Sequence, residues 1–155
     1  MTDDPVRELV ARQQISDLIH EYCVRVDRYE PEAVAELFFE DSIVDYGPTL
    51  GGPEVGRAPL AAKLRSGLGQ FEATHHQVSN IQLRFTSPDR ATGISYVRAW
   101  HKGRGKAPDF VVYGQYHDVF ERRQGHWAFA RRTILVAGHN GPPIDWIPTP
   151  RARPE

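Results

Sequence analysis

The chain has 155 residues, 40% of them hydrophobic and 25% charged, which is typical of one globular domain and excludes extensive disorder. Its 19 basic and 20 acidic residues leave a formal net charge of −1, so no strong field attracts nucleic acid or an anionic membrane. We therefore expect neither of these partners.

Cysteine content and hydropathy indicate the cellular compartment and the kinds of site that the protein can contain. The single cysteine, Cys23, excludes an internal disulfide, and no set of Cys and His residues has the spacing of a zinc site. No apolar run is long enough to span a membrane, and the N-terminal residues are acidic where a signal peptide is basic. The sequence predicts a cytoplasmic protein without a metal ion.

The first part of the chain has helical periodicity. Pro5 follows two acidic residues, and apolar residues then recur every three or four positions as far as Val26. This pattern predicts a long amphipathic helix that ends near Asp27. A second helix is predicted over 32–39, packed on the first as a hairpin, and a short third helix over 59–67.

The rest of the chain is typical of strands. A short strand is predicted over 42–46, and four longer ones over 75–85, 91–101, 110–121 and 127–137, separated by turn residues. Helices followed by strands indicate an α+β fold, in which helices cover one side of a strongly curved, mostly antiparallel sheet. Such an arrangement leaves room for a pocket between the two layers.

One domain is expected over residues 1–138, followed by a proline-rich tail over 139–155. The tail lacks periodicity but contains the apolar residues Ile144, Trp146 and Ile147. We expect these residues to lie against the mouth of the pocket or against a partner subunit.

Asp27 and His76 are the main candidates for chemistry. An ionised Asp27 that accepts a hydrogen bond from one ring nitrogen of His76 would stabilise the imidazolium formed when the other nitrogen takes a proton. Such a dyad can remove a proton from carbon beside a carbonyl and return one to a departing oxygen. The alternative is structural: Asp27 ends the helix or begins the next turn, and His76 lies on a half-buried strand.

Strand alternation separates His76 from its neighbour His75. Side chains of a regular strand alternate between faces, so His76 and Asn80 share one face and His75 points to the other. We expect His76 and Asn80 to face the same cavity. Asn80 is therefore a candidate substrate-binding residue, and His75 is ranked below His76.

Other polar side chains are candidates for holding a substrate. Tyr22 and Tyr46 can donate hydrogen bonds to a carbonyl oxygen that gains charge as the neighbouring carbon loses its proton. His101 and Tyr116, on later strands, are further candidates. For each tyrosine the alternative is a core residue whose hydroxyl reaches the edge. Interspersed basic residues, including the pair 131–132, are expected on a solvated face.

No phosphate loop, Gly-x-Ser-x-Gly elbow or dinucleotide fingerprint is present in the sequence. The glycines at 47, 51, 52 and 56 are read as turn formers instead. We therefore expect no cofactor.

The element order and four motifs resemble the SnoaL-like branch of the NTF2-like superfamily. The motifs are Ile15-x-x-Leu18-x-x-x-Tyr22-x-x-x-x-Asp27, Leu37-Phe38-x-x-Asp41, Thr74-His75-His76-x-x-x-Asn80 and Gly125-His126-Trp127-x-Phe129. The resemblance runs from about Val10 to Ala137 and implies a cone-shaped α+β fold with a deep pocket.

Within that superfamily the pattern is most similar to scytalone dehydratase, the bile-acid dehydratases and hexachlorocyclohexane dehydrochlorinase. These enzymes catalyse elimination with an Asp–His pair and no metal. The resemblance places the catalytic pair on Asp27 and His76, and pocket residues on Tyr22, Tyr46 and His101.

The residues and the resemblance together predict a cofactor-independent lyase, most closely a dehydratase, with a small hydrophobic cyclic or aromatic substrate. An isomerase or polyketide cyclase that uses the same proton abstraction is an alternative, as is a non-catalytic small-molecule-binding or assembly module. A homo-oligomer, dimer or trimer, is also expected, because an exposed sheet face commonly pairs with a copy of itself.

Overall fold

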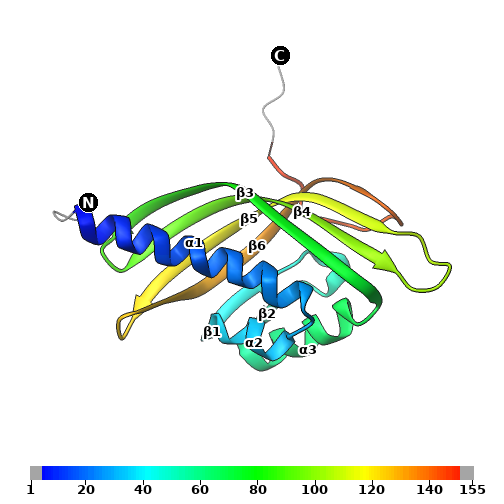
Figure 1. The fold of residues 1–155 in the computed structure, drawn as a ribbon, viewed down its shortest axis with the longest axis horizontal. Helices are drawn as coiled ribbons and strands as arrows, with labels where there is room; N and C mark the ends of the chain where they lie inside the picture. Colours follow the sequence, from blue (N-terminus) through cyan, green and yellow to red (C-terminus); the bar gives the residue numbers. More distant parts are fainter. Residues whose placement is uncertain (1–4, 151–155) are drawn as a thin grey trace, which may run out of the picture.

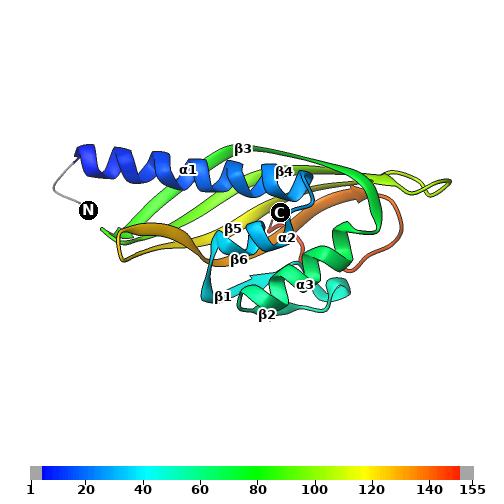
Figure 2. The same cartoon turned by 60° about the horizontal axis from the view of Figure 1, so that its bottom comes forward.

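The computed structural model describes residues 5–150, which form a helical layer and one six-stranded sheet (Figure 1). The long helix α1 (Pro5–Asp27) runs along the sheet, whereas α2 (Pro31–Glu36) and α3 (Arg57–Leu68) lie together at one end of it (Figure 2). None of the described helices is long and apolar enough to cross a membrane.

The sheet is open and mostly antiparallel. Its strand order is β2-β1-β6-β5-β4-β3, and the pairing of β1 with β6 is parallel. The strands are β1 (Phe38–Asp45), β2 (Pro53–Val55), β3 (Phe71–Ser87), β4 (Arg90–Gly103), β5 (Phe110–Arg123) and β6 (His126–Asn140), with a 3-10 turn η1 (Pro48–Leu50) between β1 and β2. The predicted α+β architecture is confirmed, and each of the four long strands extends beyond its predicted range.

The core forms where α1 packs on the sheet. Ile15, Ile19 and Val26 of α1 are buried at the helical spacing that the sequence indicated. On β4 and β5 buried residues alternate with more exposed ones, as expected for strands with one covered face. This packing fixes the end of α1, and with it Asp27, against β3.

The predicted helix over 32–39 is wrong in its second half. α2 ends at Glu36, and Phe38 begins β1. Phe38 pairs in register with Phe129 of β6 and stacks on its ring, with 4.7 Å between the ring centroids. A fully buried aromatic contact with a distant strand outweighs local helix propensity, which is worth only about 1 kcal/mol or less per residue.

The C-terminal segment packs on the domain. β6 continues to Asn140, past the predicted boundary at residue 138. Beyond it, the N–H of Val136 donates to the carbonyl of Ile147, and the N–H of Thr149 donates to the carbonyl of Val136. Ile144 and Trp146 lie against the hydrophobic core. The segment up to residue 150 is thus tied to β6, and the last predicted tail residues, 151–155, lie outside the described part.

Candidate active site

A cavity of about 900 Å³ lies between the helices and the inner face of the sheet. Most of its wall is apolar and comes from every layer of the fold, including Val26, Leu64, Phe71, Phe110, Ile134 and Trp146. The C-terminal segment contributes Ile144 and Trp146 to the wall, which agrees with the first of the two alternatives predicted for it. Ile147, the third residue of that prediction, does not line the cavity. A largely apolar cavity with a few polar groups is the usual form of a small-molecule site.

Asp27 and His76 meet at this cavity, although they are 49 residues apart in the sequence. Asp27 Oδ1 lies 2.7 Å from His76 Nδ1, and Asp27 Oδ2 accepts the backbone N–H of His76 at 2.8 Å. Thr74 Oγ1 also donates to Asp27 Oδ1, at 2.8 Å. The carboxylate is therefore held by three hydrogen bonds from β3, and its position relative to the imidazole is fixed.

These contacts set the charge of Asp27. Partial burial alone would raise its pKa, but the hydrogen bonds from the ring and N–H of His76 and from Thr74 outweigh burial and lower the pKa below its usual value. Asp27 is thus ionised at neutral pH and accepts the Nδ1 proton of His76. The contact with Asp27 uses Nδ1 and leaves the opposite ring nitrogen, Nε2, unengaged by this carboxylate. The His76 side chain is only 7% exposed and lines the cavity.

His101 lies beside the dyad. Its ring is edge-on to that of His76, with 5.5 Å between the centroids, and it also lines the cavity. Burial, followed by the nearby His76, lowers the pKa of His101 to about 4. At neutral pH His101 is therefore an uncharged donor and acceptor rather than a cation.

Tyr22 and Tyr46 form a hydrogen-bonded pair in the cavity wall, with 2.7 Å between their hydroxyl oxygens. Burial raises the pKa of both phenols, and in Tyr22 the charge of Arg132 offsets part of that increase. Both hydroxyls are protonated at neutral pH. Only one of them donates to the other, so the second O–H is available to a ligand.

Tyr116 is the third buried tyrosine of the cavity, and its ring is edge-on to that of Tyr22 at 5.7 Å. Burial raises its pKa as well. In the cavity wall, Tyr116 offers a ligand an aromatic surface next to the tyrosine pair.

Asn80 is not brought to the cavity. β3 is irregular between Ser79 and Gln82, and Asn80 takes a φ of +52°, which interrupts the alternation of faces. The Asn80 side chain is exposed and does not line the cavity. The expectation that His76 and Asn80 share a face is wrong, because the β-bulge breaks the regular alternation on which it depends.

Sequence reasoning also missed a buried ion pair beneath the tyrosines. Arg132 is fully buried, and its Nε and Nη2 donate to the two carboxylate oxygens of Asp118, each at 2.8 Å. The guanidinium carbon lies 4.1 Å from the ring centroid of Tyr22 and 3.9 Å from that of Tyr116. Burial opposes the charge of Arg132, but Asp118 outweighs it and raises the arginine pKa. The expectation of a solvated face is therefore wrong for Arg132.

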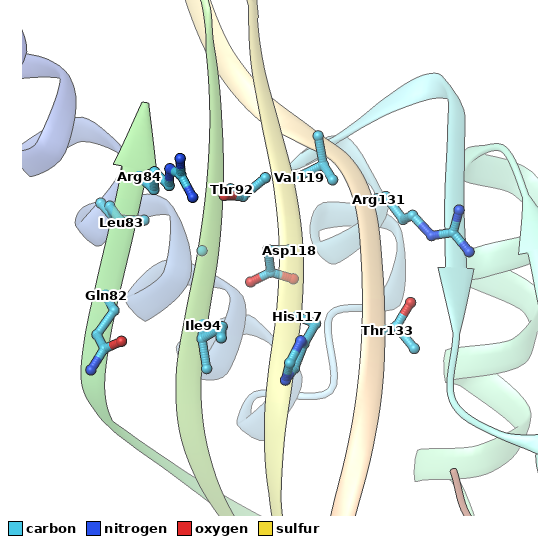
Figure 3. A pocket seen from close by; sticks show the side chains of 11 residues that line it. Gln82, Leu83, Arg84, Thr92, Ile94, His117, Asp118, Val119, Arg131 and Thr133 are labelled. Atoms are coloured by element: carbon cyan, nitrogen blue, oxygen red, sulfur yellow. The ribbon is translucent and has the colours of Figure 1, made fainter. Parts of the chain in front are cut away.

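A second hollow, of about 600 Å³, lies on the other face of the sheet (Figure 3). Side chains of β3 to β6 line it, among them Arg84, Ile94, His117 and Arg131, and α1 lies behind the strands in this view. No predicted site residue borders this hollow. The candidate chemistry is thus confined to the cavity on the helical side.

Other potentially reactive groups are few. Burial raises the pKa of Cys23 to about 12, so its thiol stays protonated. Within residues 5–150, no three His, Cys, Asp or Glu side chains are arranged to hold a metal ion.

Comparisons with known proteins agree with the motifs. Residues 7–133 match the SnoaL-like domain. Gamma-hexachlorocyclohexane dehydrochlorinase of Sphingobium indicum is 27% identical over 144 residues, which cover 87% of this chain and 90% of that protein.

Solved structures give the same assignment. A candidate scytalone dehydratase from Novosphingobium aromaticivorans superimposes with a TM-score of 0.89 at 30% identity, covering 97% of this chain and 100% of the other. A type 2 hexachlorocyclohexane dehydrochlorinase superimposes with a TM-score of 0.80 at 22% identity, covering 94% and 98%, which shows the shared fold. The chain therefore belongs to the SnoaL-like domain family, within the NTF2-like superfamily.

Proposed function

We propose that the protein is a cofactor-independent lyase that eliminates water from a small hydrophobic cyclic or aromatic substrate. The observation that carries the proposal is the 2.7 Å contact between Asp27 and His76 at the wall of a largely apolar cavity. The similarity to dehydrochlorinases supports it, because dehydrochlorination is itself an elimination.

His76 is the base in this mechanism. With Nδ1–H donated to Asp27, Nε2 takes a proton from carbon beside an electron-withdrawing group, and the C–H electron pair moves toward that group. Asp27 stabilises the imidazolium that results. General-base assistance of this kind typically contributes a factor of about 10²–10⁴ in rate.

Tyr22 and Tyr46 stabilise the charge that develops. The hydroxyl not used between them donates to the substrate carbonyl oxygen as it becomes enolate-like. The electron pair then forms the new double bond and expels hydroxide, which leaves as water after taking the proton held by His76. His101 is uncharged at neutral pH because its pKa is about 4, so we assign the return of the proton to His76 and only hydrogen bonding to His101.

His76→Ala and Asp27→Asn test the mechanism with cyclic β-hydroxy ketones as substrates. We expect each variant to lose a factor of about 10²–10⁴ in the rate of conjugated-ketone formation, followed by absorbance. His75→Ala is the matched control, since His75 is an exposed neighbour on the same strand. Circular dichroism checks that each variant is folded, and turnover unchanged in both dyad variants would reject the mechanism.

An isomerase or polyketide cyclase would use the same first step. The two classes separate with a cyclic ketone that has no leaving group, because only the proton exchange then remains. Deuterium uptake from solvent that ends in a shifted double bond or a closed ring would favour the isomerase or cyclase. Binding without exchange or turnover for every ketone tested would favour a binding module.

A further inference from the structure

We propose that the ion pair of Lys63 and Glu54 forms a second binding site in the same cavity, which receives a substrate hydroxyl remote from the carbon that loses its proton. The inference rests on the proposed function in that it concerns the same substrate. It adds a chemical requirement: the hydrophobic ring system carries a second oxygen, as an alcohol or phenol.

The two side chains come from elements that the proposed mechanism does not use. Lys63 lies on α3 and Glu54 on β2, and both line the cavity. The dyad and the tyrosine pair, in contrast, are carried by α1, by β3 and by Tyr46, which directly follows β1. A ligand that spans the cavity between these elements is therefore in contact with polar groups at two places.

The pair is formed but has hydrogen-bonding capacity left. Lys63 Nζ lies 3.0 Å from Glu54 Oε1 and donates to the carbonyl of Gly52 at 2.8 Å. These contacts use two of the three N–H groups of the ammonium. The carboxylate of Glu54 likewise has more acceptor sites than one contact occupies. The side chains are 15% and 30% exposed, so both are partly withdrawn from bulk water.

Most of the wall that α3 contributes beside Lys63 is apolar, with Ser66 as a polar exception, which makes the pair selective. Leu64 and Leu68 of α3 and Pro59 at its start line the cavity around Lys63. Arg104, the other cationic residue of the wall, is exposed and donates to the carbonyl of Gly69 at 3.2 Å. A few polar groups in an apolar cavity fix the orientation of a ligand more than they add to its affinity.

The charges of the pair indicate which group it binds. A hydroxyl can accept from the free N–H of Lys63 and donate to the carboxylate of Glu54 at the same time. A ligand carboxylate is attracted by Lys63 but repelled by Glu54. A methyl group displaces water from both charged groups and forms no hydrogen bond in its place. Hydrogen bonds to charged groups typically increase affinity by about tenfold or more, compared with a ligand that lacks the hydroxyl.

Binding of naphthols, which undergo no elimination, tests the inference independently of turnover. The probes are naphthalene-2,6-diol, 6-methyl-2-naphthol and 6-hydroxy-2-naphthoate, with dissociation constants from isothermal titration calorimetry. We expect the diol to bind the unaltered protein about tenfold more tightly than either other probe. Lys63→Met is expected to abolish the preference for the diol over the methyl compound, and Glu54→Gln to weaken the preference over the naphthoate.

Lys102→Met is the matched control. Lys102 also forms an ion pair, with Asp109 at 2.9 Å, but it does not line the cavity. Its loss is expected to leave all three affinities unchanged. Thermal unfolding of each variant separates loss of binding from loss of structure, since Lys63 also ties α3 to the chain at Gly52.

Equal affinity of the unaltered protein for the diol and the methyl compound would overturn the inference. So would a preference for the diol that survives in both folded variants, Lys63→Met and Glu54→Gln. Failure of the elimination assay with an intact diol preference would refute the proposed function alone. Elimination activity without a preference for the diol would refute only the hydroxyl site.

Discussion

His101 makes the stability of the fold depend on pH. Its ring packs against Phe71 and Phe110, with centroid distances of 4.7 Å and 5.4 Å, and its pKa is lowered to about 4 by burial and by His76. In an unfolded chain a histidine has a pKa of about 6.5. Between these two values the unfolded state holds a proton that the folded state does not, so stability falls as the pH falls.

The size of this effect follows from the difference between the two pKa values. A difference of about 2.5 units, at 1.36 kcal/mol per unit, corresponds to about 3 kcal/mol of unfolding free energy. This contribution is fully present above about pH 6.5 and is lost as the pH falls to about 4. Such a loss is a large fraction of the 5–15 kcal/mol that is typical of a domain.

The substitution His101→Phe removes the titrating group and keeps an aromatic ring between Phe71 and Phe110. Urea unfolding of both proteins at several pH values from about 7.5 to about 4 gives their free energies of unfolding. We expect the unaltered protein to lose about 3 kcal/mol relative to the variant over this range. A difference between the two proteins that stays constant with pH would refute the reasoning, because it would mean that His101 takes up its proton equally in both states.

Three further predictions concern the framework. Arg132→Met alone is expected to lower the free energy of unfolding, measured with urea, by about 3–5 kcal/mol, because it leaves Asp118 buried and unpaired. Arg132→Met combined with Asp118→Leu is expected to recover most of that loss. A double variant as unstable as the single one would contradict this. Gly114→Ala is expected to lower the unfolding temperature, since a Cβ there would lie 2.6 Å from a carbonyl oxygen of β6, whereas Gly138→Ala has no atom within 4 Å of its new Cβ and should unfold near the original temperature. Light scattering coupled to size exclusion is expected to give the mass of a dimer or trimer, and a monomer mass at every concentration tested would refute the predicted homo-oligomer.

The fold was largely accessible to sequence reasoning because its signals are local. The 3.6-residue period of α1 and the turn residues between the long strands depend on neighbours a few positions apart. The end of α2 was not accessible in this way, since Phe38 joins β1 through its contact with Phe129, and no local pattern reports a partner so far along the chain.

For the candidate site, too, the residue types could be predicted from the sequence, whereas their positions in space depend on contacts between distant segments. Asp27, His76, Tyr22 and Tyr46 could be proposed from residue type and from a family resemblance, but only the packing of α1 on β3 brings the first two within hydrogen-bonding distance. The face of Asn80 was not accessible in this way, because Asn80 lies within a β-bulge, where the regular alternation of faces is interrupted.

Arg132 illustrates how such a residue can be found. On β6 it lies two and four positions before Ile134 and Val136, which are apolar and buried. Side chains two positions apart on a strand share a face, so strand parity alone places the Arg132 side chain on the inner face. A charge on that face requires a partner, because an unpaired buried charge is too costly to persist. Asp118 lies directly opposite on β5, in register with Arg132. Parity combined with this requirement would therefore have replaced the solvated-face interpretation with a search for one carboxylate on the adjacent strand.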